Sequence, residues 1–513
     1  MPGRFFPQMF GLAVWWAFVI QSPISSANIA HRRHVDADKR QNFLERTLIL
    51  LDVNTRTPVR VLNDNFLSLQ VDPSILKNGW LDFLSSKRLV TLARGLSPAY
   101  LRFGGKRTDF LQFHNLKNLA KFRGPGPDYY LKNYEDDIVR SDIALDKQKG
   151  CKLASHPDMM LELQREKAAQ MQQVLLKEQL SNHYSDVTIT ARSLDKLYNF
   201  ADCAGLHLIF GLNALHRNPD NSWNASSALS LLKYSAGKKY NISWELGNEP
   251  NSYRTMVARS VNSSRLAQDY IMLKTLLQSV RYYSRANLYG PNIGRPRKNA
   301  ILLLEGFYID RRVTKVEDFL KTRLLDTLTG QITKVLKIVK KHAPEKRVWL
   351  GGVGPAWAGG ISNLSDTFAA GLLWLNTLGI SAIQGIDVVL RHSFFDYGYS
   401  HLVDQQFSPL PDYWLSLLFK RLVGPRVLAV QVAGLQRKPR PGKVIRDKLR
   451  IYAHCTSFTK SVQLNGEHLV MLDSDTFPEL KPRTLRAGRT ILMPPVSIGF
   501  YVIKNINAIA CRR

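Results

Sequence analysis

The sequence predicts an α/β fold in which a parallel α/β barrel is followed by a small antiparallel β domain. Two observations lead to this prediction. In the middle of the chain apolar strands alternate with helices, as at His207–Leu215, Ser226–Ser235 and Tyr240–Pro250. Such alternation is typical of a parallel sheet covered by helices. After about Val427 apolar and polar residues alternate with a period of two, which is typical of antiparallel strands.

The other elements of the predicted barrel follow the same alternation. We expect strands within Thr47–Asp72 and at Ala99–Phe103 and Arg347–Gly352, and helices at Ser264–Ser284 and Asp326–Lys341. Residues 124–182 are first polar and rich in turn formers and then strongly helical by propensity, so we expect an exposed insertion there. Polar residues at the carboxyl ends of barrel strands are where such folds hold their functional groups.

The N-terminus has the pattern of a secretory leader. Arg4 precedes an apolar run from Met9 to Ile20, and small residues follow at Ser25–Ala27. A bilayer span needs about 20 apolar residues, so this run is short for a membrane anchor, which is the alternative interpretation. We therefore expect residues 1–30 to be a signal peptide, with no transmembrane segment after it, and the protein to be secreted.

The charge of the chain points to a polyanionic partner. It has 71 Lys and Arg against 41 Asp and Glu, a net charge of +30, and such an excess attracts polyanions over long range. A secreted protein meets sulfated glycosaminoglycans before nucleic acid, so we expect no nucleic-acid partner. Four Asn-x-Ser sequons support the secretory route and are predicted glycosylation sites: Asn224, Asn241, Asn262 and Asn363.

The four cysteines fall into two widely separated pairs. Cys151 and Cys203 lie in the first half of the chain, and Cys455 and Cys511 lie near its end. Four cysteines allow three connectivities. Pairing within each half is the simplest of them.

A short motif suggests one half of a glycosidase active site. Retaining glycosidases place two carboxyl groups about 5–5.5 Å apart, one as acid/base and one as nucleophile. Asn248-Glu249-Pro250, at the end of a predicted strand, has the pattern of the acid/base half, and Asn248 could hydrogen-bond a sugar hydroxyl. Alone, this tripeptide is equally typical of a surface turn.

The motif lies within longer stretches that resemble one family. The sequences at Leu92–Phe110, Leu208–Arg217, Leu364–Gly379 and His401–Gly424 closely resemble heparanases, which are members of glycoside hydrolase family 79. Further stretches, such as GPGPDYYLKNYEDDIVRSD, resemble an inactive branch of that family.

The resemblance implies a (β/α)8 TIM barrel at residues 31–426 and a C-terminal antiparallel β-sandwich at 427–513. It also implies that Glu249 is the acid/base, that Asn248 and Asn213 contact the substrate, and that Cys151 pairs with Cys203 and Cys455 with Cys511. We expect neither a metal ion nor a cofactor.

The chain departs from the family at the nucleophile. Active heparanases carry a glutamate where this chain has Gly352, and no carboxylate occurs between Glu345 and Asp366. Without the second carboxylate a retaining enzyme loses its covalent intermediate, and such losses reduce rates by orders of magnitude. We therefore predict a pseudoenzyme in which Glu249 is idle in catalysis and is either a sugar-contacting residue or a relic. An inverting mechanism with Asp366 or Asp396 as a distant base is the alternative.

Two basic clusters are predicted to bind heparan sulfate. They consist of Arg437, Lys438, Arg440 and Lys443 in an extended, proline-containing segment, and of Arg295, Arg297 and Lys298. The expected function is to bind heparin and heparan sulfate proteoglycans at the cell surface and in the extracellular matrix, and to regulate heparanase or compete with it. The alternatives are an active endo-β-glucuronidase and a structural matrix protein.

Two elements of the family pattern are missing. The family has a further barrel strand where Leu302–Phe307 continues directly into Tyr308, and several further sandwich strands where Cys455–Lys460 continues into Ser461. We therefore expect a barrel that lacks one strand and a shortened sandwich.

Overall fold

The computed structural model describes residues 11–19, 49–77, 80–115, 143–146, 151–154, 171–257, 260–294, 315–356, 360–396, 398–434, 449–456, 469–473, 476–480, 484–486, 490–491, 493, 496–506 and 508–512. Within these ranges no helix combines the length and the apolar character needed to cross a bilayer.

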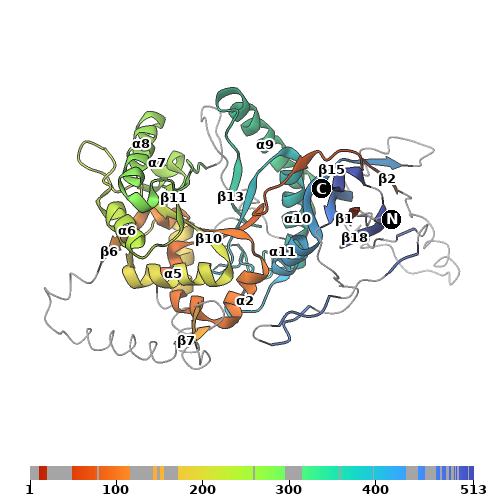
Figure 1. Ribbon diagram of the computed structural model, residues 1–513, viewed down its shortest axis with the longest axis horizontal. Helices are drawn as coiled ribbons and strands as arrows, with labels where there is room; N and C mark the ends of the chain where they lie inside the picture. The colour runs from red at the N-terminus through yellow and green to blue at the C-terminus, as the bar shows by residue number, and fades with distance from the viewer. Residues whose placement is uncertain are drawn as a thin grey trace, which may run out of the picture.

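A parallel sheet forms the centre of the larger part of the molecule (Figure 1). Its order is β12-β11-β10-β5-β4-β14-β13, and every neighbouring pair is parallel. The strands are β4 (Leu67–Val71), β5 (Ala99–Phe103), β10 (Leu206–Leu212), β11 (Ile242–Leu246), β12 (Leu288–Tyr289), β13 (Trp349–Val353) and β14 (Val388–His392). The described residues thus provide seven strands, and the prediction of a parallel α/β barrel-type sheet is confirmed.

Helices connect and cover these strands (Figure 1). They are α2 (Lys87–Gly95), α5 (Ala191–Ala204), α6 (Ser226–Gly237), α7 (Tyr253–Val257), α8 (Ser263–Ser279), α9 (Thr322–His342), α10 (Phe368–Gln384) and α11 (Pro411–Leu422). Helix α5 shows why such segments begin and end where they do. The Thr190 side chain accepts a hydrogen bond from the Ser193 N–H at its start, and Gly205, at φ 69°, ends it in the left-handed conformation.

A second, antiparallel sheet lies beside the barrel. Its order is β18-β1-β17-β15-β3, and a separate pair joins β16 to β2. These strands are β1 (Gly11–Val19), β2 (Ile49–Val53), β3 (Arg60–Val61), β15 (Val423–Leu428), β16 (Val430–Gly434), β17 (Leu449–Thr456) and β18 (Ser497–Ile506).

The second sheet combines strands from both ends of the chain. β2 and β3 fall in the range expected for the barrel, β15 crosses the boundary expected at 426, and β1 lies within the expected leader. Strand pairing explains this arrangement, because each segment supplies backbone donors and acceptors to a C-terminal strand. Two smaller pairs complete the described strands: β6 (Leu111–His114) with β9 (Val187–Thr190), and β7 (Ile143–Asp146) with β8 (Cys151–Ala154).

Helix α10 lies between the two sheets (Figure 1), and 14 of its 17 residues are buried. A helix that is apolar on all sides is suited to such a position. On the side of the second sheet, the Tyr452 hydroxyl donates to Asn376 Oδ1 at 2.8 Å. A Cβ at Gly379 would lie 2.5 Å from the Tyr452 ring, so this glycine allows the sheet to pack closely on the helix.

Candidate functional site

Glu249 lies in a constrained turn directly after β11, all five residues of which are buried. The turn begins with Gly247 at φ 70°, where a Cβ would lie 2.5 Å from Tyr253 Oη and 2.8 Å from Ala214 Cβ. Only glycine fits this position. Glu249 itself adopts φ 54° and ψ 55°, which residues other than glycine rarely do. The turn therefore sets the position of its carboxyl group at the carboxyl end of the sheet.

The surroundings of Glu249 favour its protonated form. The residue is only 9% exposed, and burial raises the pKa of its carboxyl group above the usual value. The positive charge of Lys106, hydrogen bonds from Ser252 and Asn248, and the charge of Arg102 oppose this rise without cancelling it. A raised carboxyl pKa is what a general acid requires.

Arg102 links three strands beneath this turn. From β5 its guanidinium donates to both carboxylate oxygens of Glu245, at 2.6 and 2.9 Å, and to Gln70 Oε1 on β4 at 3.0 Å. It also donates to Asn248 Oδ1 at 3.0 Å. Arg102 and Glu245 are almost fully buried. A buried, bidentate ion pair therefore holds the side chain of Asn248, one of the predicted substrate contacts, in one orientation.

Asp109 connects the ends of β10 and β11. Its carboxylate accepts from the Ala214 N–H at 3.0 Å, the Asn248 N–H at 2.9 Å and the Tyr253 hydroxyl at 2.8 Å. Burial raises the pKa of Asp109 to about 7, although these hydrogen bonds lower it and the charge of Glu245 adds a smaller rise. Asp109 thus fixes the backbone on which Asn248 lies. Sequence analysis missed it, because nothing in the Thr108-Asp109-Phe110 segment indicates a strand end or a turn.

Asn292 contacts the turn that carries Glu249 and lies beside β13, the strand that carries Gly352. The Asn292 carbonyl accepts from the Glu249 N–H at 3.0 Å, and its Nδ2 donates to Asn248 Oδ1 at 3.4 Å. On β13, a Cβ at Gly351 would lie 3.6 Å from Asn292 Nδ2. Sequence analysis missed Asn292 because it follows β12, a strand of only two residues.

Gly352, the predicted nucleophile position, is buried. Gly352 adopts φ 66° within β13, and none of its atoms extends beyond the backbone. A glycine there can neither attack an anomeric carbon nor stabilise positive charge on it. Of the two predicted catalytic positions, only Glu249 therefore carries a functional group.

Other buried carboxylates at this end of the sheet already have partners. Asp72 accepts from Arg107 Nη1 at 3.1 Å, and Asp396 accepts from the Gly398 N–H at 2.7 Å. Burial raises the pKa of Asp396, but the hydrogen bond from His401 and nearby positive charge outweigh it and lower the pKa overall. Asp366 lies in the turn before α10. Nothing in the described geometry places Asp366 or Asp396 opposite Glu249.

The remaining predicted site residues are placed as follows. The Asn213 side chain is engaged locally, since its Oδ1 accepts from the N–H groups of Leu215 and His216 and its Nδ2 donates to the Leu111 carbonyl. Asn241, Asn262 and Asn363 are exposed, whereas Asn224 is half-buried. Both predicted basic clusters lie outside the described residues.

Both disulfides implied by the resemblance are present. Cys151 at the start of β8, within the predicted insertion, pairs with Cys203 in α5 and attaches β8 to the barrel. Cys455 in β17 pairs with Cys511 near the C-terminus. The pairing within each half of the chain is therefore confirmed.

The fold and the strand-end site around Glu249 define a class: a glycoside-hydrolase-like α/β protein. Residues 154–297 match the family model for the N-terminal domain of glycosyl hydrolase family 79. The chain is 65% identical to inactive heparanase-2 of Homo sapiens, covering 98% of this chain and 95% of the relative, and 40% identical to heparanase of Mus musculus, covering 90% and 94%. The chain belongs to the heparanase family.

The alignment with the human relative extends over 566 positions, more than the 513 residues of this chain, so parts of the relative have no counterpart here. Among solved structures, a rhamnosyl-glucuronidase from Fusarium oxysporum is similar at 13% identity with a TM-score of 0.46, covering 74% of this chain and 78% of that one.

Proposed function

We propose that this protein is secreted, binds heparan sulfate and heparin without cleaving them, and regulates heparanase or competes with it at proteoglycans. The proposal rests on the resemblance that assigns the nucleophile of active family members to the position of the buried Gly352, and on Glu249, whose carboxyl pKa is raised by burial. A single carboxyl group cannot complete the double displacement of a retaining enzyme.

Several features support ligand binding without catalysis. The net charge of +30 attracts sulfated chains. Asn248 is held in one orientation by Arg102, so the polar groups at the carboxyl end of β11 are fixed in position. The inactivity named for the 65% identical relatives is in line with this proposal.

Two measurements on one sample of the full chain test the proposal. We expect the protein to be retained on immobilised heparin at physiological ionic strength, and long heparan sulfate chains to keep their size distribution after prolonged incubation. The Glu249→Gln variant is the control for traces of a contaminating enzyme. Reproducible shortening of the chains that disappears in this variant would show that the protein is an active endo-β-glucuronidase.

The basic clusters and the route of secretion need separate tests. Neutralising Arg437, Lys438, Arg440 and Lys443 should lower the salt concentration of heparin elution more than neutralising Arg295, Arg297 and Lys298, because the longer cluster offers more simultaneous ionic contacts. Expression in a secretory cell line, with comparison of medium and lysate, tests whether the protein leaves the cell. A structural matrix protein without heparin affinity would elute at low salt in all variants.

A further inference from the structure

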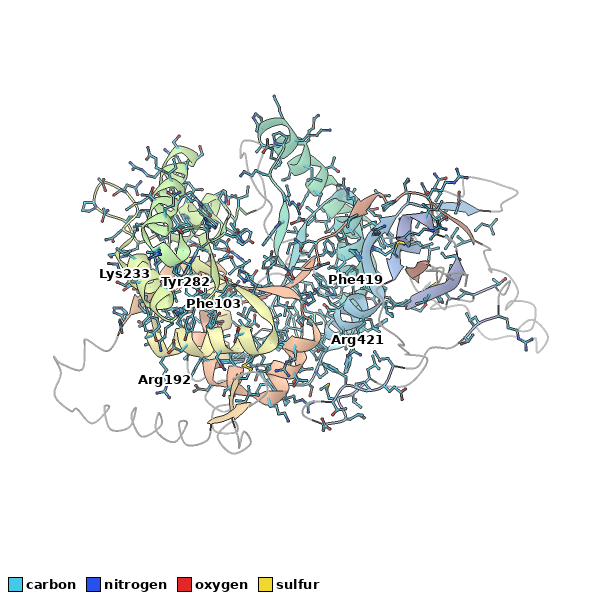
Figure 2. All side chains as sticks on the ribbon, viewed as in Figure 1. Phe103, Arg192, Lys233, Tyr282, Phe419 and Arg421 are labelled. Atoms are coloured by element: carbon cyan, nitrogen blue, oxygen red, sulfur yellow. A yellow bond between two sulfur atoms is a disulfide. The ribbon has the colours of Figure 1, made fainter. Side chains whose placement is uncertain are left out.

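Helix α9 presents a row of lysines that the catalytic site does not use. Its buried face consists of Leu325, Leu328, Ile332, Val335 and Val339. At 3.6 residues per turn, Lys334, Lys337 and Lys341 fall on the opposite side of the helix, and all three are exposed. In Figures 1 and 2, α9 projects from the body of the molecule, with side chains extending into the solvent.

The charge around this row is almost entirely positive. Residues 327–347 contain six Lys and Arg and a single acid, Glu345. The neighbouring basic residue Arg347 already pairs with Asp387 at 2.9 Å. By contrast, none of the three lysine side chains has an ion pair or hydrogen bond with any other residue that the structure describes. Their ammonium groups are therefore directed toward solvent.

Helix stability does not explain the row. Cations are favourable in the last turn, where they interact with the helix dipole, and this covers Lys340 and Lys341 but not Lys334 and Lys337. Lys337 and Lys341 are four residues apart, and Lys334 and Lys337 are three apart. Like charges at these spacings repel and destabilise a helix. An arrangement that weakens the isolated helix is explained if an anionic ligand compensates the charge.

We propose that the surface formed by Lys334, Lys337 and Lys341 binds a sulfated polysaccharide chain at a site separate from the turn that carries Glu249. This inference rests on the proposed function. The three residues cover about 10 Å along the helix axis, which suits a linear polyanion with regularly spaced sulfates. α9 ends just before β13 begins, so its C-terminal half lies toward the amino ends of the strands, whereas Glu249 lies at the carboxyl end of β11.

A charge-matched pair of variants tests the surface. The first is Lys334→Gln/Lys337→Gln/Lys341→Gln. The control is Lys177→Gln/Lys233→Gln/Lys274→Gln, which removes the same charge from exposed lysines that are dispersed over the molecule. Gln and Lys have similar helix propensities, so both variants should keep the helices. Heparin affinity is measured at several salt concentrations.

Counterion release predicts the result. Log affinity for a polyanion falls linearly with log salt, with a slope near the number of ionic contacts. We expect the α9 variant to reduce the magnitude of this slope by about two to three and the control variant by less than about one. Equal slopes and affinities for the α9 variant, the control and the wild type would overturn the proposal.

Footprinting of the wild-type protein gives a second readout that does not depend on folding of a variant. Lysines are acetylated with and without heparin and quantified by mass spectrometry. We expect heparin to reduce acetylation of Lys334, Lys337 and Lys341 at least about threefold while Lys233 and Lys274 change little. If heparin binds but leaves α9 unprotected, this inference is wrong and the proposed function stands; if heparin does not bind at all, both fail.

Discussion

The rings of Tyr289 and Trp349 lie 4.4 Å apart, with 34° between their planes, and bring together the two edge strands of the main sheet. Tyr289 ends β12 and Trp349 begins β13, and these strands are the two ends of the strand order. Tyr100 packs on the same indole at 5.0 Å, and the indole N–H donates to Asp387 at 3.1 Å. Side chains, not a backbone ladder, therefore hold the described edges together.

Removal of this indole should destabilise the barrel. Fully buried aromatic side chains contribute about 3–5 kcal/mol to stability. Trp349 is half-buried, so Trp349→Ala should lower the free energy of unfolding by somewhat less, about 2–4 kcal/mol. Trp349→Phe keeps a ring and should lose less than half of that. Urea denaturation followed by circular dichroism measures both. An alanine variant as stable as the wild type would show that the ring contact contributes nothing to closure.

The Arg102–Glu245 pair should show strong coupling. Arg102→Met leaves the Glu245 carboxylate buried and unpaired, which typically costs about 3–5 kcal/mol of stability. The double variant Arg102→Met/Glu245→Leu removes both charges and should recover a substantial part of the loss. A double-mutant cycle from denaturation curves gives the coupling energy. Simple additivity of the two single changes would contradict a buried pair.

Asp109 should make stability depend on pH. Its pKa is about 7 in the folded protein and near 3.8 in the unfolded chain. Below about pH 4 both states bind the proton; between about pH 4 and 7 only the folded state does, so the free energy of unfolding falls as pH rises through this window. The total change is on the order of 4 kcal/mol.

The Asp109→Asn variant should flatten this profile. The slope of unfolding free energy against pH gives the number of protons released on unfolding. Because asparagine cannot titrate, this number should fall by up to one between pH 4 and 7, even though the variant is less stable at every pH. Asp220→Asn is the control, because Asp220 is fully exposed and its pKa is lowered by its hydrogen bonds with Ser222. An unchanged slope in Asp109→Asn would show that another group causes the pH dependence.

The C-terminal disulfide should be a major contributor to stability of the second sheet. Cys455 and Cys511 are 56 residues apart in sequence, and closing a loop of that length stabilises a folded protein by about 4 kcal/mol in the chain-entropy model. Cys455→Ser/Cys511→Ser should therefore unfold at distinctly lower denaturant concentration than the wild type. Comparison with the reduced wild type controls for the serines. Equal midpoints for the oxidised wild type and the variant would exclude this contribution.

The sequence by itself determined the class of fold and most element positions. Ala99–Phe103 was predicted as a strand with the bounds of β5, and the helix expected at Asp326–Lys341 is α9, only a few residues longer at its start. Burial on one helix face leaves a periodicity in the sequence, and burial on both strand faces leaves a short continuous apolar run. The prediction that Gly352 replaces the nucleophile has a different basis, because it depends on residue identity within a stretch that resembles the family.

Only the tertiary structure decided which residues surround Glu249 and which strands share a sheet. Arg102, Asp109 and Asn292 come from distant segments and meet at Asn248 through hydrogen bonds that no local pattern records. β2 and β3 pair with C-terminal strands more than 350 residues away. Long-range pairing and buried polar networks depend on complementary partners, and a partner becomes identifiable only when the chain has brought it within hydrogen-bonding distance.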